Sequence, residues 1–462
     1  MFDKKVYLER RAQLKRSVGN GLVLLLGNEE SSMNYRDNLY PFRQDSSFLY
    51  FFGIDRPALT GVIDIDNDSE IVFGDDFTTE EMIWTGFREP LNLLSGSIGI
   101  SIVKPKKELW SFIRLAKEHD KKIHFLPPYR PEQNELLADL LGIAFGSLQG
   151  MHSVSLIKAI VAQRSYKSPG EIEEINRAVN TTAGMQLAAI TMAKAGMTEA
   201  QIAGKMQEIA IGAGGNLSFP TILTQQGQIL HNGYSHSQLT EGNLVLSDCG
   251  AETGMHYAGD LTRTFPVGTK FTPAQRDIYN IVLRAHESAV ALLQPGKPFR
   301  DIHVHACEKL AEGLQELGIM KGDLKEAVAL GAHALFFPCG LGHMMGLDTH
   351  DMENLGEAYV GYNEEIIKST QFGLKSLRLA KPLEEGFVVT IEPGLYFNPA
   401  LIDEWEANNH LGSFINYDKL KAYRNLNGIR IEEDFVIMRN GSSLLGNPLA
   451  KTADAIEELR IK

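Results

Sequence analysis

Four acidic side chains stand where the strand pattern of the chain calls for apolar ones. Asp248 ends the apolar run 244–248, and Asp260 opens a second extended segment twelve positions later. Glu392 ends another apolar run directly before a Pro-Gly pair, and Glu432 follows an arginine on the same strand face. A single acid of this kind would be interpreted as a charge that reaches solvent, because Asp and Glu are rarely buried without partners. Four carboxylates pointing into one site would repel each other, so the pattern indicates that a cation neutralises them.

Two histidines, His343 and His350, lie in a glycine-rich segment that disfavours a regular helix. A set of hard oxygen donors with one imidazole suits Mn²⁺ or a similar divalent ion better than a thiolate-type zinc site. The carboxylates therefore make these two histidines candidate site residues. Apart from His231, the ten remaining histidines are interpreted as ordinary core or surface residues.

A hairpin is the first element needed to position these residues. Residues 244–248 and 260–265 are expected to pair as two strands that carry facing aspartates. Gly254 is expected in the turn between them. Both carboxylates would then point to the same side of the sheet.

A long helix is predicted to begin after Ser168, with Pro169 at its first position and Glu171 closing a capping box. Gly196 offers a C-cap at its end. A second helical pattern covers 200–211. The predicted apolar face of the first helix consists of Ile172, Ile175, Val179, Ala183, Leu187 and Ile190.

The first third of the chain contains short apolar runs separated by turn signals. Buried strands are predicted in these runs, alternating with helices such as one at 109–116. The runs are 21–27, 48–53, 61–65 and 71–74. We therefore expect an α/β domain over 1–165 and a second, larger domain over 166–462.

The composition is that of a globular protein: of 462 residues, 44% are hydrophobic and 22% are charged. With 45 Lys and Arg against 58 Asp and Glu, the formal net charge is −13, so the basic footprint of a nucleic-acid binder is missing. Three scattered cysteines do not make a disulfide framework, which favours a reducing compartment. The first residues contain no apolar signal segment, and no early apolar run approaches the length of a membrane span. A cytoplasmic protein without nucleic-acid or membrane partners is expected.

The chemistry-bearing residues resemble those of a known family, the pita-bread dinuclear metallopeptidases. The five that match its metal ligands, in order, are Asp248, Asp260, His343, Glu392 and Glu432. The similarity extends to the flanking segments 257–265, 390–394 and 430–434, and segment 42–50 is similar to the amino-terminal domain of aminopeptidase P and the related prolidases. The resemblance implies an α/β (α+β) architecture, with a creatinase-like amino-terminal domain followed by a pita-bread catalytic domain.

The resemblance also implies a centre of two divalent ions, with Mn²⁺ expected and Co²⁺ or Zn²⁺ as alternatives. Asp260 and Glu432 would bridge the two ions. Asp248 would bind one ion, and His343 and Glu392 would bind the other. Such a pair of ions acidifies a bridging water and polarises the carbonyl of the bond to be cut.

Further roles follow from the resemblance. Glu392 is the candidate general base, and His350 is expected to donate a hydrogen bond to the peptide carbonyl. Arg430 would hold its neighbouring carboxylates in the ionised form. The implied substrate-binding residues are His231, Arg378 and Cys339.

The implied reaction is hydrolysis of the bond between an N-terminal residue and a following proline, in a peptide or dipeptide substrate. Arg378 and the segments 373–378 and 396–428 resemble the prolidases, in which the matching arginine meets the dipeptide carboxylate. This favours a dipeptidase over an aminopeptidase. The family resemblance also implies a homodimer or homotetramer.

Two other hypotheses stay open. A creatinase-like hydrolase of the same fold would work without metal, and activity that survives exhaustive chelation would favour it. Cys339 stands where relatives usually carry histidine, and a thiol is a weaker donor that is not cationic near neutral pH. A pita-bread binding protein with weakened catalysis is therefore the second alternative.

Overall fold

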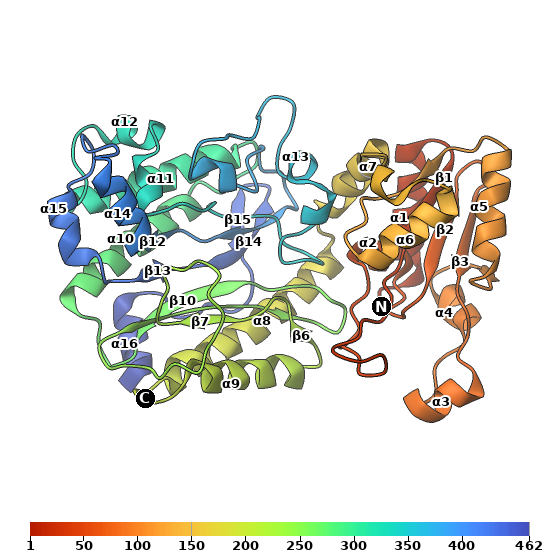
Figure 1. Ribbon diagram of the computed structural model, residues 1–462, viewed down its shortest axis with the longest axis horizontal. Helices are drawn as coiled ribbons and strands as arrows, with labels where there is room; N and C mark the ends of the chain where they lie inside the picture. Colours follow the sequence, from red (N-terminus) through yellow and green to blue (C-terminus); the bar gives the residue numbers. More distant parts are fainter. Residues whose placement is uncertain (149, 462) are drawn as a thin grey trace. The chain divides into compact units, whose positions relative to one another are not determined.

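The computed structural model describes residues 1–148 and 150–461 (Figure 1). The chain forms two compact units. The first comprises Met1–Arg164 with Asn354–Tyr359, and the second comprises Ser165–Glu353 with Val360–Lys462.

A mixed five-stranded sheet with the order β4-β3-β2-β1-β5 forms the first unit. The pairs β1–β2 and β2–β3 are antiparallel, and the outer pairs β1–β5 and β3–β4 are parallel. The strands are β1 (Leu22–Leu26), β2 (Thr60–Asp64), β3 (Ser69–Phe73), β4 (Ile102–Lys104) and β5 (Ile123–His124). The helices are α1 (Lys4–Val18), α2 (Ser46–Phe52), α3 (Thr79–Thr85), α4 (Leu91–Ser97), α5 (Glu108–Glu118), α6 (Pro131–Leu141), the 3₁₀ turn η1 (Phe145–Ser147) and α7 (Val154–Arg164).

One face of this sheet packs against α5 and α6. Leu109, Ile113 and Ala116 recur at helical spacing on α5 and are buried against Leu24 of β1 and Val62 of β2 in one apolar cluster. The strands predicted at 21–27, 61–65 and 71–74 are β1, β2 and β3, and the helix predicted at 109–116 is α5.

The strand predicted at 48–53 is wrong, because Ser46–Phe52 form helix α2. Asp45 caps this helix by accepting a hydrogen bond from the Phe48 N–H, and Gly53 ends it in the left-handed conformation at φ 61°. All seven residues of the helix are buried. A short helix buried on every side has no polar–apolar periodicity, so its sequence looks like that of a buried strand.

The second unit combines short sheets with long helices. Its strands are β6 (Asn216–Leu217), β7 (Ile222–Thr224), β8 (Leu244–Cys249), β9 (Ala251–Glu252), β10 (Leu261–Pro266), β11 (Val388–Ile391), β12 (Gly394–Tyr396), β13 (Gly428–Arg430), β14 (Glu433–Met438) and β15 (Gly441–Leu444). Its α-helices are α8 (Pro169–Met192), α9 (Glu199–Gly212), α10 (Pro273–Val290), α11 (Phe299–Glu316), α12 (Leu324–Ala329), α14 (Pro399–Ala407), α15 (Tyr417–Leu420) and α16 (Ala453–Ile461). The short helix α13 (Glu357–Val360) begins in the first unit and ends at the first residue of the returning second unit. Single 3₁₀ turns are η2 (Ala332–Leu335), η3 (Glu353–Leu355), η4 (Leu374–Ser376) and η5 (Lys421–Tyr423).

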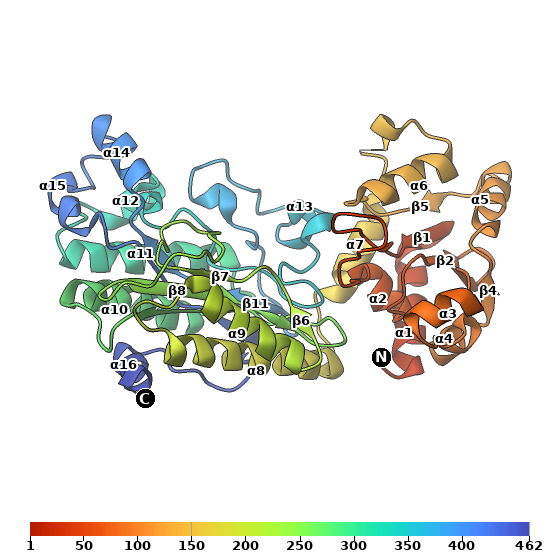
Figure 2. The ribbon, with the colours of Figure 1, turned by 60° about the horizontal axis from the view of Figure 1, so that its bottom comes forward.

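The second unit contains two antiparallel three-stranded sheets, β10-β8-β7 and β11-β14-β15. It also contains the antiparallel pair β12-β13. Helix α8 packs on β8 and β10, whereas α10 packs on β11, β12 and β13. The partners within each helix pair, α8 with α9 and α10 with α11, run side by side in both views (Figures 1 and 2). The mixed helix and sheet architecture expected from the sequence is confirmed.

Helix α8 begins as predicted, with both hydrogen bonds of the capping box present. It ends at Met192, so Gly196 is not its C-cap. The buried face also differs from the predicted one, because Leu187 is 43% exposed whereas Gln186 is buried. The Gln186 side-chain amide donates to backbone carbonyls in both β8 and β10. A polar residue lies on the buried face of this helix because it joins these two strands.

Strands β8 and β10 pair antiparallel as predicted, but the two aspartates are not directly opposite each other. Asp248 pairs with Thr262, and Asp260 lies two residues earlier on the same face. The connection contains the short strand β9 and a turn at Gly254. The two carboxylates therefore approach each other diagonally across the ladder.

The three cysteines are free thiols. Across residues 1–148 and 150–461, none of the helices combines the length and the apolar character that a membrane span requires.

Candidate metal centre

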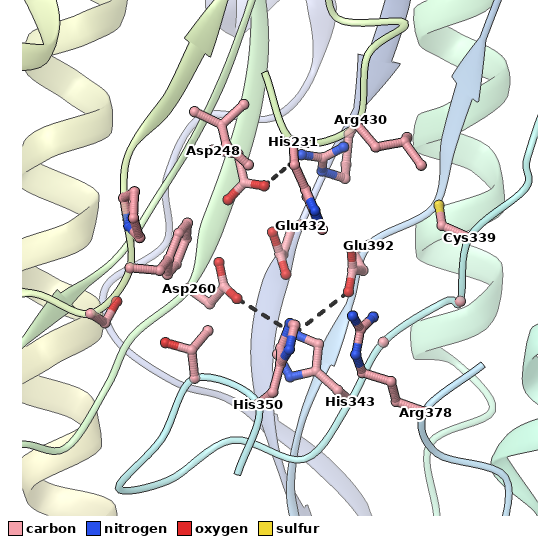
Figure 3. A pocket seen from close by; sticks show the side chains of 18 of the residues that line it. His231, Asp248, Asp260, Cys339, His343, His350, Arg378, Glu392, Arg430 and Glu432 are labelled. Atoms are coloured by element: carbon pink, nitrogen blue, oxygen red, sulfur yellow. Dashed lines mark hydrogen bonds and ion pairs between the residues drawn. The ribbon is translucent and has the colours of Figure 1, made fainter. Parts of the chain in front are cut away.

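All ten residues singled out from the sequence line one cavity of about 630 Å³ in the second unit. Figure 3 shows their side chains converging from several strands and loops. They are His231, Asp248, Asp260, Cys339, His343, His350, Arg378, Glu392, Arg430 and Glu432. These residues are far apart in the chain, so the tertiary structure alone brings them together.

Strands β8, β10 and β13 hold one side of the cavity. Asp248 lies on β8, Asp260 directly precedes β10, and Glu432 follows β13. The Glu432 N–H donates to the Thr262 carbonyl at 3.1 Å, and the Thr262 hydroxyl donates to Oε2 of Glu432 at 2.6 Å. Arg263 of β10 donates to the Glu432 carbonyl at 2.8 Å. These bonds join β10 to the residues after β13 and so set the spacing of the carboxylates.

His343 and Glu392 are positioned by the close approach of a loop to β11. The Thr390 N–H donates to the His343 carbonyl, and the His343 N–H donates to Oγ1 of Thr390, each at 3.1 Å. Gly342 is required here, because a Cβ at this position would lie 2.1 Å from the Thr390 carbonyl oxygen. The Glu392 N–H donates to the Leu341 carbonyl at 2.8 Å. The glycines of this segment therefore allow two backbones to meet.

Candidate ligand atoms gather at the centre of the cavity. One atom from each of Asp260, His343 and Glu432 lies within 4.8 Å of the others. Nε2 of His343 is 3.5 Å from Oδ2 of Asp260 and 3.6 Å from Oε1 of Glu392. Nδ1 of His343 is 3.0 Å from the Met344 carbonyl, which can only accept, so Nδ1 carries the proton. The Nε2 lone pair is thereby available to a metal ion.

Burial and mutual repulsion disfavour the charged forms of the carboxylates. Burial raises the pKa of Asp260 and Glu432 well above their ordinary values, and the neighbouring carboxylates raise them further. Burial also raises the pKa of Glu392 to about 7. Within the described part of the chain, Oδ1 of Asp248 and Oδ1 of Asp260 are buried and have no hydrogen-bond partner. Divalent cations fit this set, because they would neutralise the charges and use the remaining oxygen atoms.

Arg430 is a buried cation beside these carboxylates, with 3% of its surface exposed. It donates to Oδ2 of Asp248 at 2.5 Å, to the Tyr396 hydroxyl at 2.8 Å and to Oγ1 of Thr262 at 3.1 Å. Burial alone would lower the pKa of Arg430, but the surrounding Tyr396, Asp248, Glu392 and Glu432 together outweigh burial and raise that pKa. One guanidinium does not neutralise four carboxylates, so the site can still accept divalent ions.

His350 packs against His343, with 4.3 Å between the ring centroids. Its Nδ1 is hydrogen-bonded to the Glu353 carboxylate at 2.5 Å, and Nε of Arg378 lies 3.4 Å from the same carboxylate. The hydrogen bond from His350 lowers the pKa of Glu353 to about 2. Glu353 therefore orients both side chains that the sequence placed near the substrate.

Cys339 and His231 offer uncharged groups to the cavity. Burial raises the pKa of the Cys339 thiol to about 12, and burial lowers the pKa of His231. A thiol and a neutral imidazole are the forms that both residues take near pH 7.

The residues that support the site were not among those predicted from the sequence. Thr262 lies two residues after Asp260 on the same strand face, but its contact with Glu432 has no local signal. Glu353, Thr390 and Tyr396 become neighbours of the candidate residues only in the folded chain.

Comparison with known proteins gives two family matches. Residues 173–439 match the model described as metallopeptidase family M24, and residues 7–124 match the model described as aminopeptidase P, N-terminal domain. The Xaa-Pro aminopeptidase of Escherichia coli is 30% identical over 99% of this chain and 98% of its own length. The human Xaa-Pro dipeptidase is 28% identical over 94% of this chain and 88% of its own length. Among solved structures, proline aminopeptidase P II from Yersinia pestis superposes with a TM-score of 0.82 at 28% identity, covering 100% of both chains.

Proposed function

Because the chain belongs to metallopeptidase family M24 and contains an aminopeptidase P N-terminal domain, we propose that it is a metal-dependent exopeptidase that hydrolyses the bond between an N-terminal residue and a following proline. The observation that carries this proposal is the convergence of four carboxylates and His343 on one cavity. A volume of about 630 Å³ is typical of pockets for small ligands, so short peptides are the matching substrates.

The proposed ligands of the divalent ions are the five residues at the centre of the cavity. They are Asp248, Asp260, His343, Glu392 and Glu432. The oxygen-rich set favours Mn²⁺, with Co²⁺ or Zn²⁺ as alternatives. When bound, two such ions supply an acidified water and polarise the scissile carbonyl.

The chain's own residues then move and hold protons. The Glu392 carboxylate would accept the proton of the attacking water. The hydrogen bond between Nδ1 of His350 and Glu353 positions the ring, and His350 would donate a hydrogen bond to the substrate carbonyl. Arg430 donates to Oδ2 of Asp248 at 2.5 Å and so fixes the orientation of this carboxylate.

Replacing Glu353 by glutamine is expected to lower kcat about tenfold, because residues that orient an active-site histidine from outside typically contribute this much. The amide still accepts from Nδ1 of His350, but the hydrogen bond is no longer charge-assisted and is therefore weaker. KM, metal content and the melting temperature are expected to stay close to wild type. Steady-state kinetics with metal analysis of the same samples measure these quantities, and an unchanged kcat contradicts the positioning role.

The other residues that line the cavity would recognise the substrate. Proline has no backbone N–H, so its ring must be recognised by shape, and the apolar residues Phe219, Ile222 and Leu230 line the same cavity. Arg378 also lines it and is half-buried. The position of this guanidinium supports the binding of the carboxylate of an Xaa-Pro dipeptide.

Replacing Arg378 by leucine is expected to raise KM for an Xaa-Pro dipeptide at least about tenfold, since a hydrogen bond to a charged group contributes about 1.5–3 kcal/mol. KM for an Xaa-Pro-Yaa tripeptide, whose carboxylate lies one residue further on, is expected to change little. The assay compares both substrates in Mn²⁺, then in Co²⁺ and Zn²⁺.

Lys375 provides the matched control, because it is an exposed cation on the same segment, and K375L is expected to leave both KM values unchanged. If the wild-type enzyme cleaves tripeptides while dipeptides are inert, the dipeptidase preference fails but the Xaa-Pro activity stands. If neither substrate is cleaved in any of the three metals, the proposed function itself fails. The homo-oligomer and the cytoplasmic location stay predictions from the sequence.

A further inference from the structure

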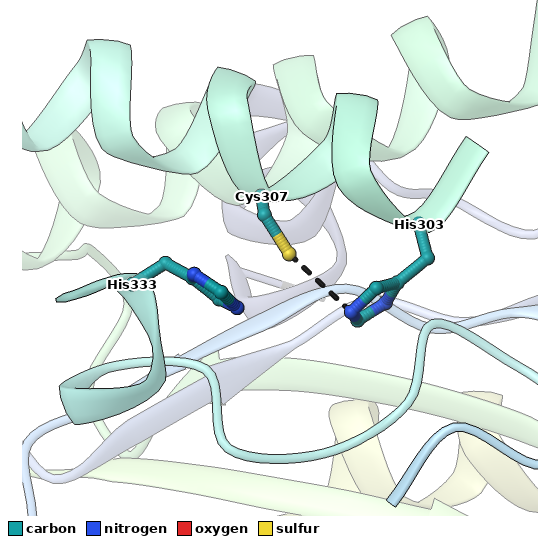
Figure 4. A group of neighbouring side chains, drawn as sticks. All are labelled: His303, Cys307 and His333. Carbon is teal, nitrogen blue, oxygen red and sulfur yellow. Dashed lines mark hydrogen bonds between the residues drawn. The ribbon is translucent and has the colours of Figure 1, made fainter. Parts of the chain in front are cut away.

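A second group of metal-ligating side chains lies outside the catalytic cavity. His303 and Cys307 are one turn apart on the same face of α11, and His333 lies on the 3₁₀ turn η2 (Figure 4). All three are buried, with exposures of 0%, 1% and 2%. None of them lines the cavity that holds the carboxylates.

The spacing of these side chains matches metal coordination. One ligand atom from each residue lies within 4.8 Å of the others. Sγ of Cys307 is 3.5 Å from Nε2 of His303. With metal–sulfur and metal–nitrogen distances of about 2.3 and 2.0 Å, two ligands at a tetrahedral angle are about 3.5 Å apart.

The hydrogen bonding of the two imidazoles is incomplete. Nδ1 of His303 is buried without a partner among the described residues. His333 makes no hydrogen bond of ordinary geometry there, although the Val328 carbonyl is near enough to oppose the effect of burial on its pKa. Each buried polar atom left without a partner costs about 1–3 kcal/mol. If these residues were ordinary core histidines, the free-energy cost of their unpartnered nitrogen atoms would remain. A bound metal ion would remove this cost.

The protonation states also suit a metal. Burial lowers the pKa of His303 to about 3 and that of His333 to about 4, so both rings are neutral and can donate a lone pair. Burial raises the pKa of the Cys307 thiol, but a coordinating metal ion deprotonates a thiol outright.

We propose that His303, Cys307 and His333 bind a zinc ion in a site that shares no residue with the catalytic centre. Two imidazoles and one thiolate form a borderline-soft set, which favours Zn²⁺ over the Mn²⁺ that suits the carboxylates. The ion would join α11 to η2, and from η2 the chain runs on to Cys339 and His343. The segment that leads to Arg378 also passes here, because a Cβ at Gly373 would lie 3.3 Å from Nε2 of His333. The zinc ion therefore stabilises two segments that carry cavity residues.

Cobalt is the probe, because a thiolate bound to Co²⁺ gives a near-ultraviolet charge-transfer absorption that oxygen and nitrogen ligands do not give. The protein is produced in Co²⁺ medium, so that a buried site fills as the chain folds. The Asp260→Asn background removes the oxygen-rich centre. We expect about one Co²⁺ per chain with the thiolate absorption in this background.

Two cysteine variants separate the possible thiolates. Cys307→Ser is expected to abolish the absorption and the bound Co²⁺, whereas Cys339→Ser, which changes a cavity thiol, is expected to keep both. Loss of the absorption in Cys339→Ser with its retention in Cys307→Ser overturns the proposal. Absence of any thiolate absorption in the Asp260→Asn protein overturns it without any cysteine variant, so misfolding of Cys307→Ser leaves the test intact. Neither result depends on peptidase activity, so failure here is distinct from failure of the proposed function.

Discussion

Glutamine in place of Glu392 is expected to lower kcat for an Xaa-Pro substrate by about a thousandfold while most of the bound metal stays. A general base contributes about 10²–10⁴-fold to the rate of a proton transfer, and an amide cannot accept the proton of the attacking water. The glutamine carbonyl oxygen can still face His343, whose Nε2 lies 3.6 Å from Oε1 of Glu392. The measurement is kcat at saturating substrate, together with the metal content of the same preparation.

Glu364→Gln is the matched control, because Glu364 is exposed and outside the cavity, and its kcat is expected to equal that of wild type. Near-normal turnover of Glu392→Gln at normal metal content would remove Glu392 from the role of general base. If metal and activity fall together, the loss of activity follows from the loss of the Glu392 ligand.

Asparagine in place of Asp260 is expected to have two effects of opposite sign. Activity is expected to fall at least about a thousandfold, since the stabilisation of transition-state charge by a metal ion contributes several kcal/mol and each 1.4 kcal/mol is tenfold in rate. The metal-free variant is nevertheless expected to be more stable than metal-free wild type. Burial and the neighbouring carboxylates raise the pKa of Asp260, so the neutral amide relieves repulsion. A new hydrogen bond to a carboxylate contributes about 1.5–3 kcal/mol.

Denaturation with and without Mn²⁺ measures both effects. Mn²⁺ is expected to raise the free energy of unfolding of wild type, because it binds only the folded state, and to leave that of the variant unchanged. Asp277→Asn, on the exposed side of α10, is the control and is expected to respond to Mn²⁺ as wild type does. Exhaustive chelation of wild type is expected to reproduce the loss of activity, and activity that survives chelation would support the metal-free alternative. A metal-free variant less stable than metal-free wild type would contradict the repulsion argument.

Much of the fold was predictable where a local sequence pattern is compatible with only one kind of secondary structure. The capping box at Ser168 predicted the start of α8, because its two hydrogen bonds involve residues only three positions apart. The mixed architecture followed from strands and helices that alternate along the chain. Helix α2 was not predictable, since its seven residues are buried on every side and show no period that separates a helix from a strand.

The candidate site likewise contains some residues that a local pattern reveals and others that it does not. Asp248 and Glu392 stood out because an acid at the end of an apolar strand violates a period of two residues, which is visible in the sequence. The residues that hold these candidates in place show no such pattern in the sequence. Glu353 orients His350 from the first residue of η3, and Thr262 contacts Glu432 across 170 positions.

By itself, the sequence determined the types and order of the candidate ligands, since strand periodicity and side-chain chemistry are local properties. Only the tertiary structure decided the diagonal placement of Asp248 and Asp260, the approach of the Gly342 loop to β11, and the meeting of His303 with His333. The physical reason is that these contacts depend on how whole strands and helices pack. Such packing is a sum of many weak contacts between distant residues, and no short segment of sequence contains it.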